Sequence, residues 1–190
     1  MHIGIDYGAK LAGTTAICFE KTGKLVIVQS EKKKDADKFV QKVVQDLQPS
    51  SIFIDAPLSL PLAYFGEGEN YFYRACDKAL QAMSPMFLGG LTARAIKLSK
   101  PFESNGIVLF ETYPAQIVKH YLPDTQGYKK QKIYLEDFCK VLLTKLPYEW
   151  VKLPENWHQV DSILAWWTGW RYKNEEVKVY GNKKEGLIYV

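Results

Sequence analysis

The chain has 190 residues, of which 47% are apolar, and a formal net charge of +4. This size predicts a single domain, because a chain of this length buries roughly 70% of its unfolded surface in one core. No apolar run reaches the roughly 20 residues that cross a bilayer, and the N-terminus lacks a secretory pattern. The three cysteines form no CxxC pair. We therefore expect a cytoplasmic protein with reduced thiols and no membrane contact, whose mild positive charge is compatible with a polyanionic partner.

The first third of the chain predicts three strands, a helix and a fourth strand. Apolar residues favour strands over 3–7, 13–19 and 25–29, and Gly23 supplies the turn of an antiparallel hairpin between the last two. Residues 35–48 have apolar positions at helical spacing, and Pro49 ends that helix before a strand at 51–55. A helix between strands indicates a crossover, so we expect the fourth strand to have a parallel neighbour.

The rest of the chain predicts an insertion, a fifth strand and several helices. Residues 57–104 are interpreted as an insertion with helices at 70–81 and 92–98, separated by a break at Pro85, Gly89 and Gly90. A buried strand follows at 107–110. Helices are then expected at 115–121, 130–146 and 157–172, and a closing hairpin is possible from 177–180 and 186–190. This order is typical of a mixed sheet with helices on both faces.

Carboxylates recur where the predicted strands end. Asp6 is followed by Gly8, whose backbone allows a ligand to come close, and Asp55 is followed by Pro57, which ends the strand. Glu111 ends the fifth strand, and Asp161 lies near the start of the last long helix. Each has a plain structural alternative as a turn or cap residue, and Asp161 could simply favour the positive end of the helix dipole.

Five sequence blocks carry a resemblance to a known family. They are IGIDYG at the N-terminus, IDAPLSLP at 54–61, RACD at 74–77, ETYP at 111–114 and VDSILAWWTGW at 160–170. In this order they resemble the ribonuclease H-like fold and, within it, the DUF429 family of predicted nucleases. The resemblance implies one α/β domain over residues 1–190, with a mixed five-stranded sheet, helices on both faces, and the insertion at about 57–104 after the fourth strand. It also implies that the first and fourth strands are neighbours, and that the protein is a hydrolase cutting phosphodiester bonds of nucleic acid.

In such a fold Asp6, Asp55, Glu111 and Asp161 would meet in one small volume, where they would be both catalytic residues and metal ligands. Carboxylates a few ångströms apart raise one another's pKa unless a cation intervenes. Oxygen ligands without a cysteine pair favour Mg²⁺ or Mn²⁺. Two such ions about 3.5–4 Å apart would stabilise the attacking water and the leaving oxygen of a phosphodiester displacement.

Basic and aromatic residues near these carboxylates are candidates for substrate binding. Lys10, Arg74 and Arg94 could each contact a phosphate, although a turn position for Lys10 and ion pairs within the chain for the arginines are the alternatives. His158 shares a helix face with Asp161 and is either a partner of the site or a structural histidine. Aromatic residues in the insertion could stack on the bases of a single strand or pack the insertion onto the body: Tyr64, Phe65, Tyr71, Phe72 and Tyr73.

Three functions remain open at this point. The first is a metal-dependent nuclease, and the second is a non-catalytic ribonuclease H-like module that binds a nucleotide or a nucleic acid in the same cleft. The third, a phosphotransferase that binds ATP, is disfavoured because related kinases need two such domains. Four acidic positions favour the nuclease, since phosphate binding alone would sooner recruit basic side chains and backbone N–H groups.

Overall fold

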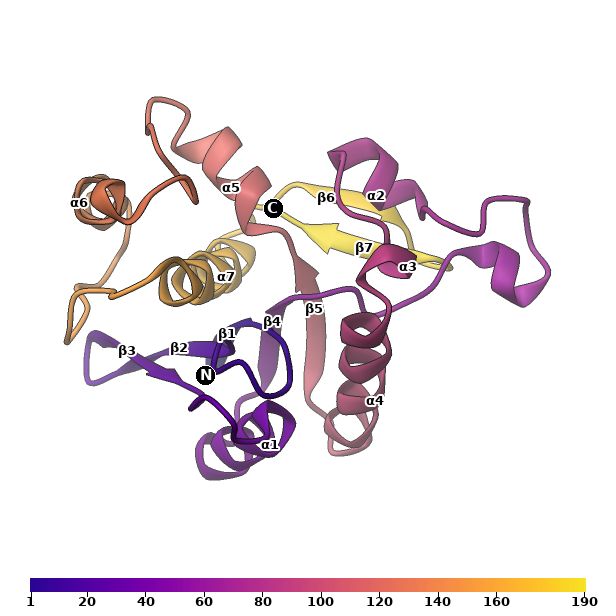
Figure 1. The fold of residues 1–190 in the computed structure, drawn as a ribbon, viewed down its shortest axis with the longest axis horizontal. Coiled ribbons are helices and arrows are strands. Elements are labelled where there is room, and N and C mark those ends of the chain that lie inside the picture. The colour runs from indigo at the N-terminus through magenta and orange to yellow at the C-terminus, as the bar shows by residue number, and fades with distance from the viewer.

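The central sheet has seven strands in the order β3-β2-β1-β4-β5-β7-β6 (Figure 1). The computed structural model describes all residues from Met1 to Val190. The first three strands form the expected antiparallel meander, and β4 and β5 continue the sheet in parallel with β1. The strands are β1 (His2–Asp6), β2 (Ala16–Lys21), β3 (Lys24–Gln29), β4 (Ser51–Asp55), β5 (Val108–Thr112), β6 (Val179–Asn182) and β7 (Gly186–Tyr189).

The prediction of a five-stranded sheet was wrong, because the C-terminal hairpin joins the sheet. β7 pairs in parallel with β5 through Glu111 and Thr112, and β6 pairs with β7 in the antiparallel sense. The apolar pattern of residues 177–190 indicates the hairpin itself. Its place in the sheet depends on the free edge of β5, far away in the sequence, which a local pattern does not encode.

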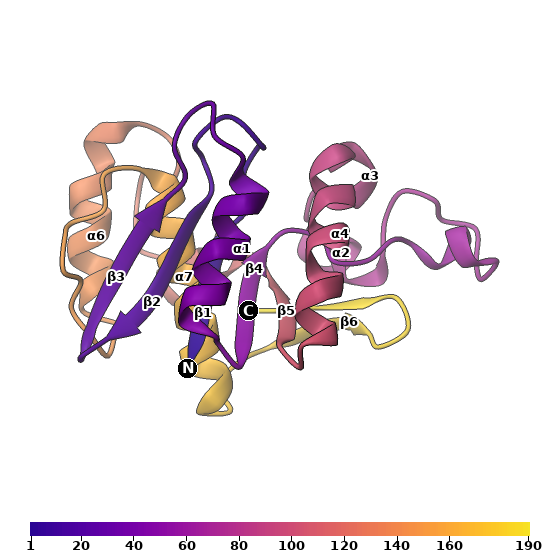
Figure 2. The same cartoon turned by 90° about the horizontal axis from the view of Figure 1, so that it is seen from below.

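Helices cover both faces of the sheet, as expected. Figure 2 shows α1 and α4 in front of the strands, with α6 and α7 behind them. Ile3 and Ile5 pack with α1 and α4 in one core, and α5, α6 and α7 build the other core around Trp166. None of the helices combines the length and the apolar character needed to cross a bilayer. The helical segments are α1 (Ala36–Leu47), η1 (Leu62–Phe65), α2 (Ala75–Leu80), α3 (Pro85–Leu88), α4 (Gly90–Ser104), α5 (Pro114–Tyr121), η2 (Lys132–Tyr134), α6 (Leu135–Leu143) and α7 (Trp157–Lys173).

The helices of the insertion differ from the expectation at their ends. The Asn70 side chain accepts hydrogen bonds from the N–H groups of Phe72 and Tyr73, at 3.0 and 2.8 Å, and this turn delays α2 to Ala75. In contrast, α4 continues past Pro101 to Ser104. Burial of Phe102 in the core therefore outweighs the hydrogen bond that the proline cannot donate. The expected helix at 130–146 is replaced by η2 and the shorter α6.

Gly4 determines how closely α7 approaches the sheet. A Cβ atom at Gly4 would lie 2.1 Å from the backbone nitrogen of Trp166 and 2.4 Å from the carbonyl oxygen of Ser162. No side chain fits in that space, so the backbone of α7 lies directly against β1. This contact brings Asp161, the residue before Ser162, to the end of β1 where Asp6 lies.

Candidate functional site

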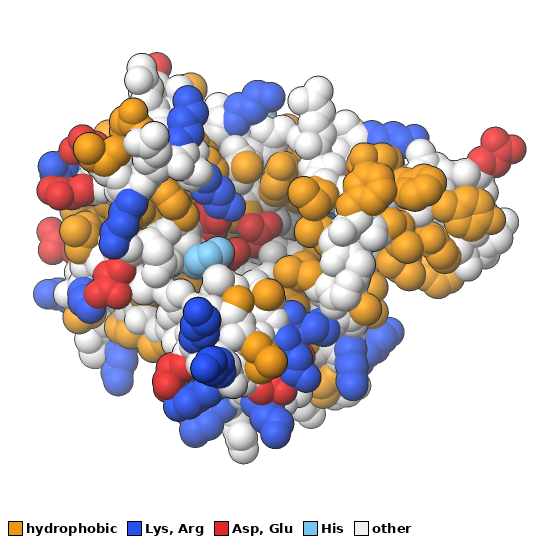
Figure 3. Space-filling view, in the orientation of Figure 1, with side chains coloured by type: hydrophobic (Ala, Val, Ile, Leu, Met, Phe, Trp, Pro, Cys, Tyr) orange, Lys and Arg blue, Asp and Glu red, His pale blue; other side chains and the backbone are white.

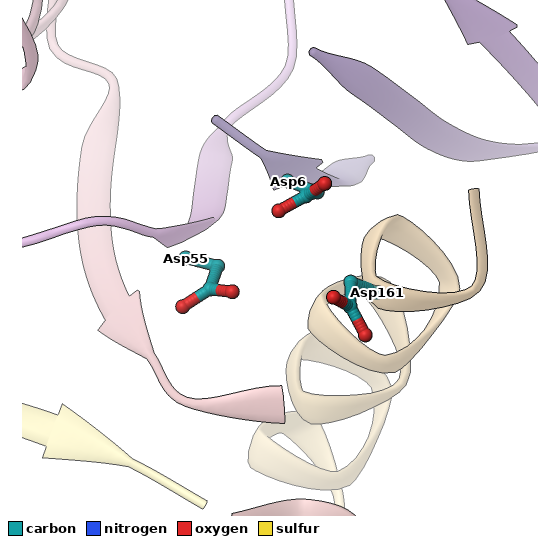
Figure 4. A group of neighbouring side chains, drawn as sticks. All are labelled: Asp6, Asp55 and Asp161. Atoms are coloured by element: carbon teal, nitrogen blue, oxygen red, sulfur yellow. The ribbon is translucent and has the colours of Figure 1, made fainter. Parts of the chain in front are cut away.

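Three of the four predicted carboxylates meet at the end of the sheet where β1 and β4 finish. Asp6 and Asp55 are partners in the parallel pairing of β1 and β4. Both therefore lie at the carboxyl ends of neighbouring strands. Asp161 approaches from α7, and the nearest carboxylate oxygens of the three residues all lie within 4.8 Å of one another. Figure 4 shows the three side chains around a common space. We call this cluster the acidic triad.

Repulsion between these carboxylates is only partly relieved by the protein. Asp55 is half-buried and accepts no hydrogen bond; burial, and then the charges of Asp6 and Asp161, raise its pKa well above the usual value. Burial likewise raises the pKa of Asp161 to about 6, although Lys129 opposes this shift. The triad therefore holds negative charge in a poorly solvated place, which a bound cation would stabilise.

Two residues that the sequence did not indicate hold Asp161. The hydroxyl group of Tyr128 donates a hydrogen bond of 2.5 Å to Oδ1 of Asp161. The Nζ atom of Lys129 lies 2.5 Å from the buried Oδ2 of Asp161 and forms an ion pair with it. Burial disfavours the Lys129 ammonium, but Asp161 outweighs this effect and the pKa of Lys129 is raised. The loop between α5 and η2 has no periodic pattern, so no local signal places it at the site.

His158 contacts the other side of the triad. Its Nδ1 atom lies 2.7 Å from Oδ2 of Asp6, one turn of α7 before Asp161. The hydrogen bond to Asp6 raises the pKa of His158 above its ordinary value, against the effect of burial. The ring is partly exposed, so His158 is a partner of the site that can exchange protons with solvent.

Glu111, the fourth predicted carboxylate, forms a buried ion pair with Arg74. The two guanidinium nitrogens Nη1 and Nη2 donate hydrogen bonds of 2.7 and 2.6 Å to Oε2 and Oε1 of Glu111. The N–H group of Leu58 donates a further bond of 3.0 Å to Oε2. Burial raises the pKa of Glu111 even though Arg74 opposes the shift. Glu111 borders the same cavity as Asp6 and Asp55, but both of its oxygens already accept hydrogen bonds within the protein.

The predicted phosphate-binding residues lie in ion pairs within the chain. Arg74 is completely buried and also binds Asp77 through Nε and Nη2, at 3.0 and 2.7 Å. Arg94 binds Asp37 and donates to the carbonyl oxygen of Gly8, at 3.0 Å. Lys10 lies 3.2 Å from Asp35 and remains half exposed. Of these three basic residues, Lys10 therefore presents the most accessible charge.

A cavity of about 300 Å³ opens over Asp6 and Asp55. Figure 3 shows acidic side chains at the bottom of a hollow, with hydrophobic surface extending from one side of it. A larger cavity of about 770 Å³ between α1 and α4 contains no ionisable side chain, whereas the smaller cavity contains two members of the acidic triad and is therefore the candidate site. Its lining combines charged and apolar residues, namely Asp6, Asp55, Asp77, Glu111 and Lys129 with Tyr7, Ala56, Pro57, Ala82, Met83, Leu88, Leu91, Thr112, Tyr113 and Ile188.

The donor set of the triad fits a divalent cation. Three carboxylates offer hard oxygen ligands within one small volume, and no cysteine lies among them. Comparisons with protein-family models and with curated proteins give no match. The chemistry of the site therefore carries the functional argument.

Proposed function

We propose that this chain is a divalent-metal-dependent nuclease of the ribonuclease H-like type, as its resemblance to the DUF429 family implies. One observation carries the proposal, namely the convergence of Asp6, Asp55 and Asp161 within 4.8 Å, with Asp55 free of any hydrogen-bond partner. Phosphodiester hydrolysis requires that negative charge on the phosphate be neutralised. Cations bound by an acidic triad would neutralise this charge.

The arrangement of the first five strands supports the ribonuclease H-like assignment. An antiparallel meander is followed by a strand that crosses over to lie parallel beside β1, which places Asp6 and Asp55 at adjacent strand ends. The helix that carries Asp161 packs across β1. The hairpin of β6 and β7 is then an addition at the β5 edge.

Asp6, Asp55 and Asp161 would hold Mg²⁺ or Mn²⁺, which when bound would neutralise the phosphate and activate water for in-line attack. His158 would exchange a proton beside Asp6, because it contacts that carboxylate and reaches solvent. Because Arg74 forms an ion pair with Glu111, that carboxylate would not hold a metal ion, and the triad would be the metal-holding group.

Cleavage of labelled oligonucleotides tests this proposal. With Mg²⁺ or Mn²⁺ present, we expect the wild-type protein to cut DNA or RNA, and Asp6→Asn and Asp55→Asn to lose at least about a hundredfold in rate, as typical losses of catalytic groups do. Asp46→Asn is the matched control, because Asp46 is an exposed aspartate paired only with Lys42. Undiminished cleavage by both triad variants would exclude the scheme. Metal-dependent binding of oligonucleotides without cleavage would instead favour the non-catalytic module.

A further inference from the structure

The insertion carries a group of exposed aromatic side chains next to the candidate site. Residues 62–73 project from the body as an arm beyond α2 and α3 (Figure 1). Phe65 and Phe87 are 68% and 64% exposed, and Tyr64, Tyr71 and Phe72 are also exposed. We call residues 62–73 together with Phe87 the aromatic arm. Large apolar side chains at this density on a projecting segment mark a binding surface rather than part of the core.

The rings of the aromatic arm contact one another but remain largely exposed to solvent. Tyr64 and Tyr71 meet edge to face, with centroids 5.3 Å apart. Phe72 and Phe87 are tilted by 42° at 5.8 Å, and Tyr73 meets Phe87 edge to face at 6.0 Å. None of these pairs stacks face to face. Ring faces of this kind are the surfaces on which nucleic-acid bases stack.

The arm is anchored at both ends by the β6–β7 hairpin. The Glu185 carboxylate accepts hydrogen bonds from the N–H groups of Leu62, at 3.1 Å, and Ala75, at 2.7 Å. Lys184 forms an ion pair of 3.1 Å with Glu67. These contacts order the arm in the absence of a ligand, which lowers the entropy cost of binding.

The aromatic arm continues the apolar wall of the acidic cavity. Met83 and Leu88, on either side of Phe87 in the chain, line the cavity that contains Asp6 and Asp55. Figure 3 shows hydrophobic surface running from the hollow onto the projecting segment. A ligand that occupies the cavity can therefore reach the aromatic arm past Met83 and Leu88.

Basic residues lie in the loops next to the strand end that carries Asp6. The loop after β1 and the loop before α1 pack together through a hydrogen bond of 2.8 Å from the N–H of Lys33 to the carbonyl of Leu11. Both loops lie at the same edge of the sheet as α3 (Figure 2). Lys32 and Lys33 are exposed, and neither forms an ion pair, whereas Lys34 and Lys10 do. This side supplies positive charge for a polyanion.

We propose that the substrate of this site is single-stranded nucleic acid, whose bases stack on the aromatic arm while its backbone crosses the acidic triad toward the basic loops. This inference rests on the proposed function and names its substrate class. The bases of a duplex are stacked inside the helix and cannot stack on the rings of the arm. A single strand exposes both its bases and its phosphates. A second copy of the chain could cover the rings, but it would not account for their continuity with a carboxylate-lined cavity.

Equilibrium binding of a fluorescent 20-nucleotide strand and of the corresponding duplex tests the proposal. Asp55→Asn protein in EDTA is used throughout, so that metal-dependent cleavage does not interfere. We expect the single strand to bind more tightly than the duplex, and Phe72→Ala with Phe87→Ala to weaken single-strand binding by at least about fivefold. Tyr148→Ala is the control, because Tyr148 is an exposed aromatic residue near Trp166, away from the cavity. Phe72→Leu with Phe87→Leu keeps apolar volume but removes the ring faces, so it should weaken binding similarly.

Equal affinity for the two oligonucleotides, or unchanged single-strand binding by the leucine variants, would overturn the proposal. A wild-type dimer that the alanine variants convert to a monomer would also overturn it and assign the arm to self-association. The binding assay is independent of hydrolysis. Cleavage without arm-dependent binding would refute only this inference, and arm-dependent binding without cleavage would refute only the nuclease.

Discussion

Asp6 and Asp55 are direct partners in the parallel pairing of β1 and β4, so two carboxylates leave the sheet side by side. His158 contacts Asp6, whereas no protein group donates a hydrogen bond to Asp55. Asp161 then adds a third carboxylate to the same space. Without a bound cation, repulsion within the acidic triad destabilises the folded protein relative to the unfolded chain.

Neutralising Asp55 should stabilise the metal-free protein. We expect Asp55→Asn to raise the melting temperature in EDTA by about 2–4 °C, which corresponds to roughly 1 kcal/mol for a chain of this size. The same variant should lose the stabilisation that millimolar Mn²⁺ gives to the wild type. Differential scanning fluorimetry measures both effects, and Asp46→Asn should show neither change. A lower melting temperature for Asp55→Asn in EDTA would contradict the electrostatic argument.

The metal-free protein should become less stable between pH 5 and pH 8. Asp161 has a pKa of about 6 in the folded protein against 3.8 unfolded, so below about pH 6 the folded state holds a proton that the unfolded chain has released, and the stability linked to this proton is lost as the pH rises through 6. The raised pKa of His158 acts in the same direction, because its contribution is complete below the unfolded pKa and is lost as the pH rises through the folded value. The loss should be on the order of 2 kcal/mol. Melting curves in EDTA at several pH values test this, and Asp161→Asn should flatten the profile.

Lys129 would compete with a metal ion for Asp161. Removing its charge in Lys129→Met should strengthen Mn²⁺ binding by about tenfold, because a cation 2.5 Å from a ligand oxygen opposes a second cation there. Isothermal titration calorimetry at low ionic strength measures the affinity. Lys130→Met is the matched control, since its lysine is adjacent in sequence and forms no ion pair. Weaker Mn²⁺ binding by Lys129→Met would mean that Lys129 positions Asp161 for the metal.

Arg74 should be essential for stability, since its guanidinium neutralises two buried carboxylates, Glu111 and Asp77. Truncation in Arg74→Ala leaves both unpaired, and we expect a loss of about 3–5 kcal/mol in the free energy of unfolding. Urea unfolding followed by circular dichroism gives this value. Lys97→Ala, at an exposed position without an ion pair, should change it by less than about 0.5 kcal/mol. A similarly small effect for Arg74→Ala would show that the buried pairs are dispensable.

The parts of the site that follow from strand ends were predictable from the sequence. Apolar strands that stop at Asp6 and Asp55 predict two carboxylates at strand ends, and the helix before the fourth strand predicts a parallel neighbour for it. That this neighbour is the first strand was expected only from the resemblance to the ribonuclease H-like fold. The placement of Lys129 was not predictable, because it lies in a loop whose path depends on packing far from its own sequence. Glu111 likewise has the expected position at a strand end, but its engagement by Arg74 depends on how the insertion folds back. The hairpin was visible as a pattern, while its partner strand was not.

The close contact of α7 with β1 at Gly4 means that the triad draws on both halves of the polypeptide. Asp6 and Asp55 leave the ribosome early, but Asp161 emerges only after α5 and α6 have been synthesised. A nascent or truncated chain that lacks α7 would keep two repelling carboxylates without their third ligand. A metal ion held by all three carboxylates would therefore require α7 to be synthesised and packed against β1.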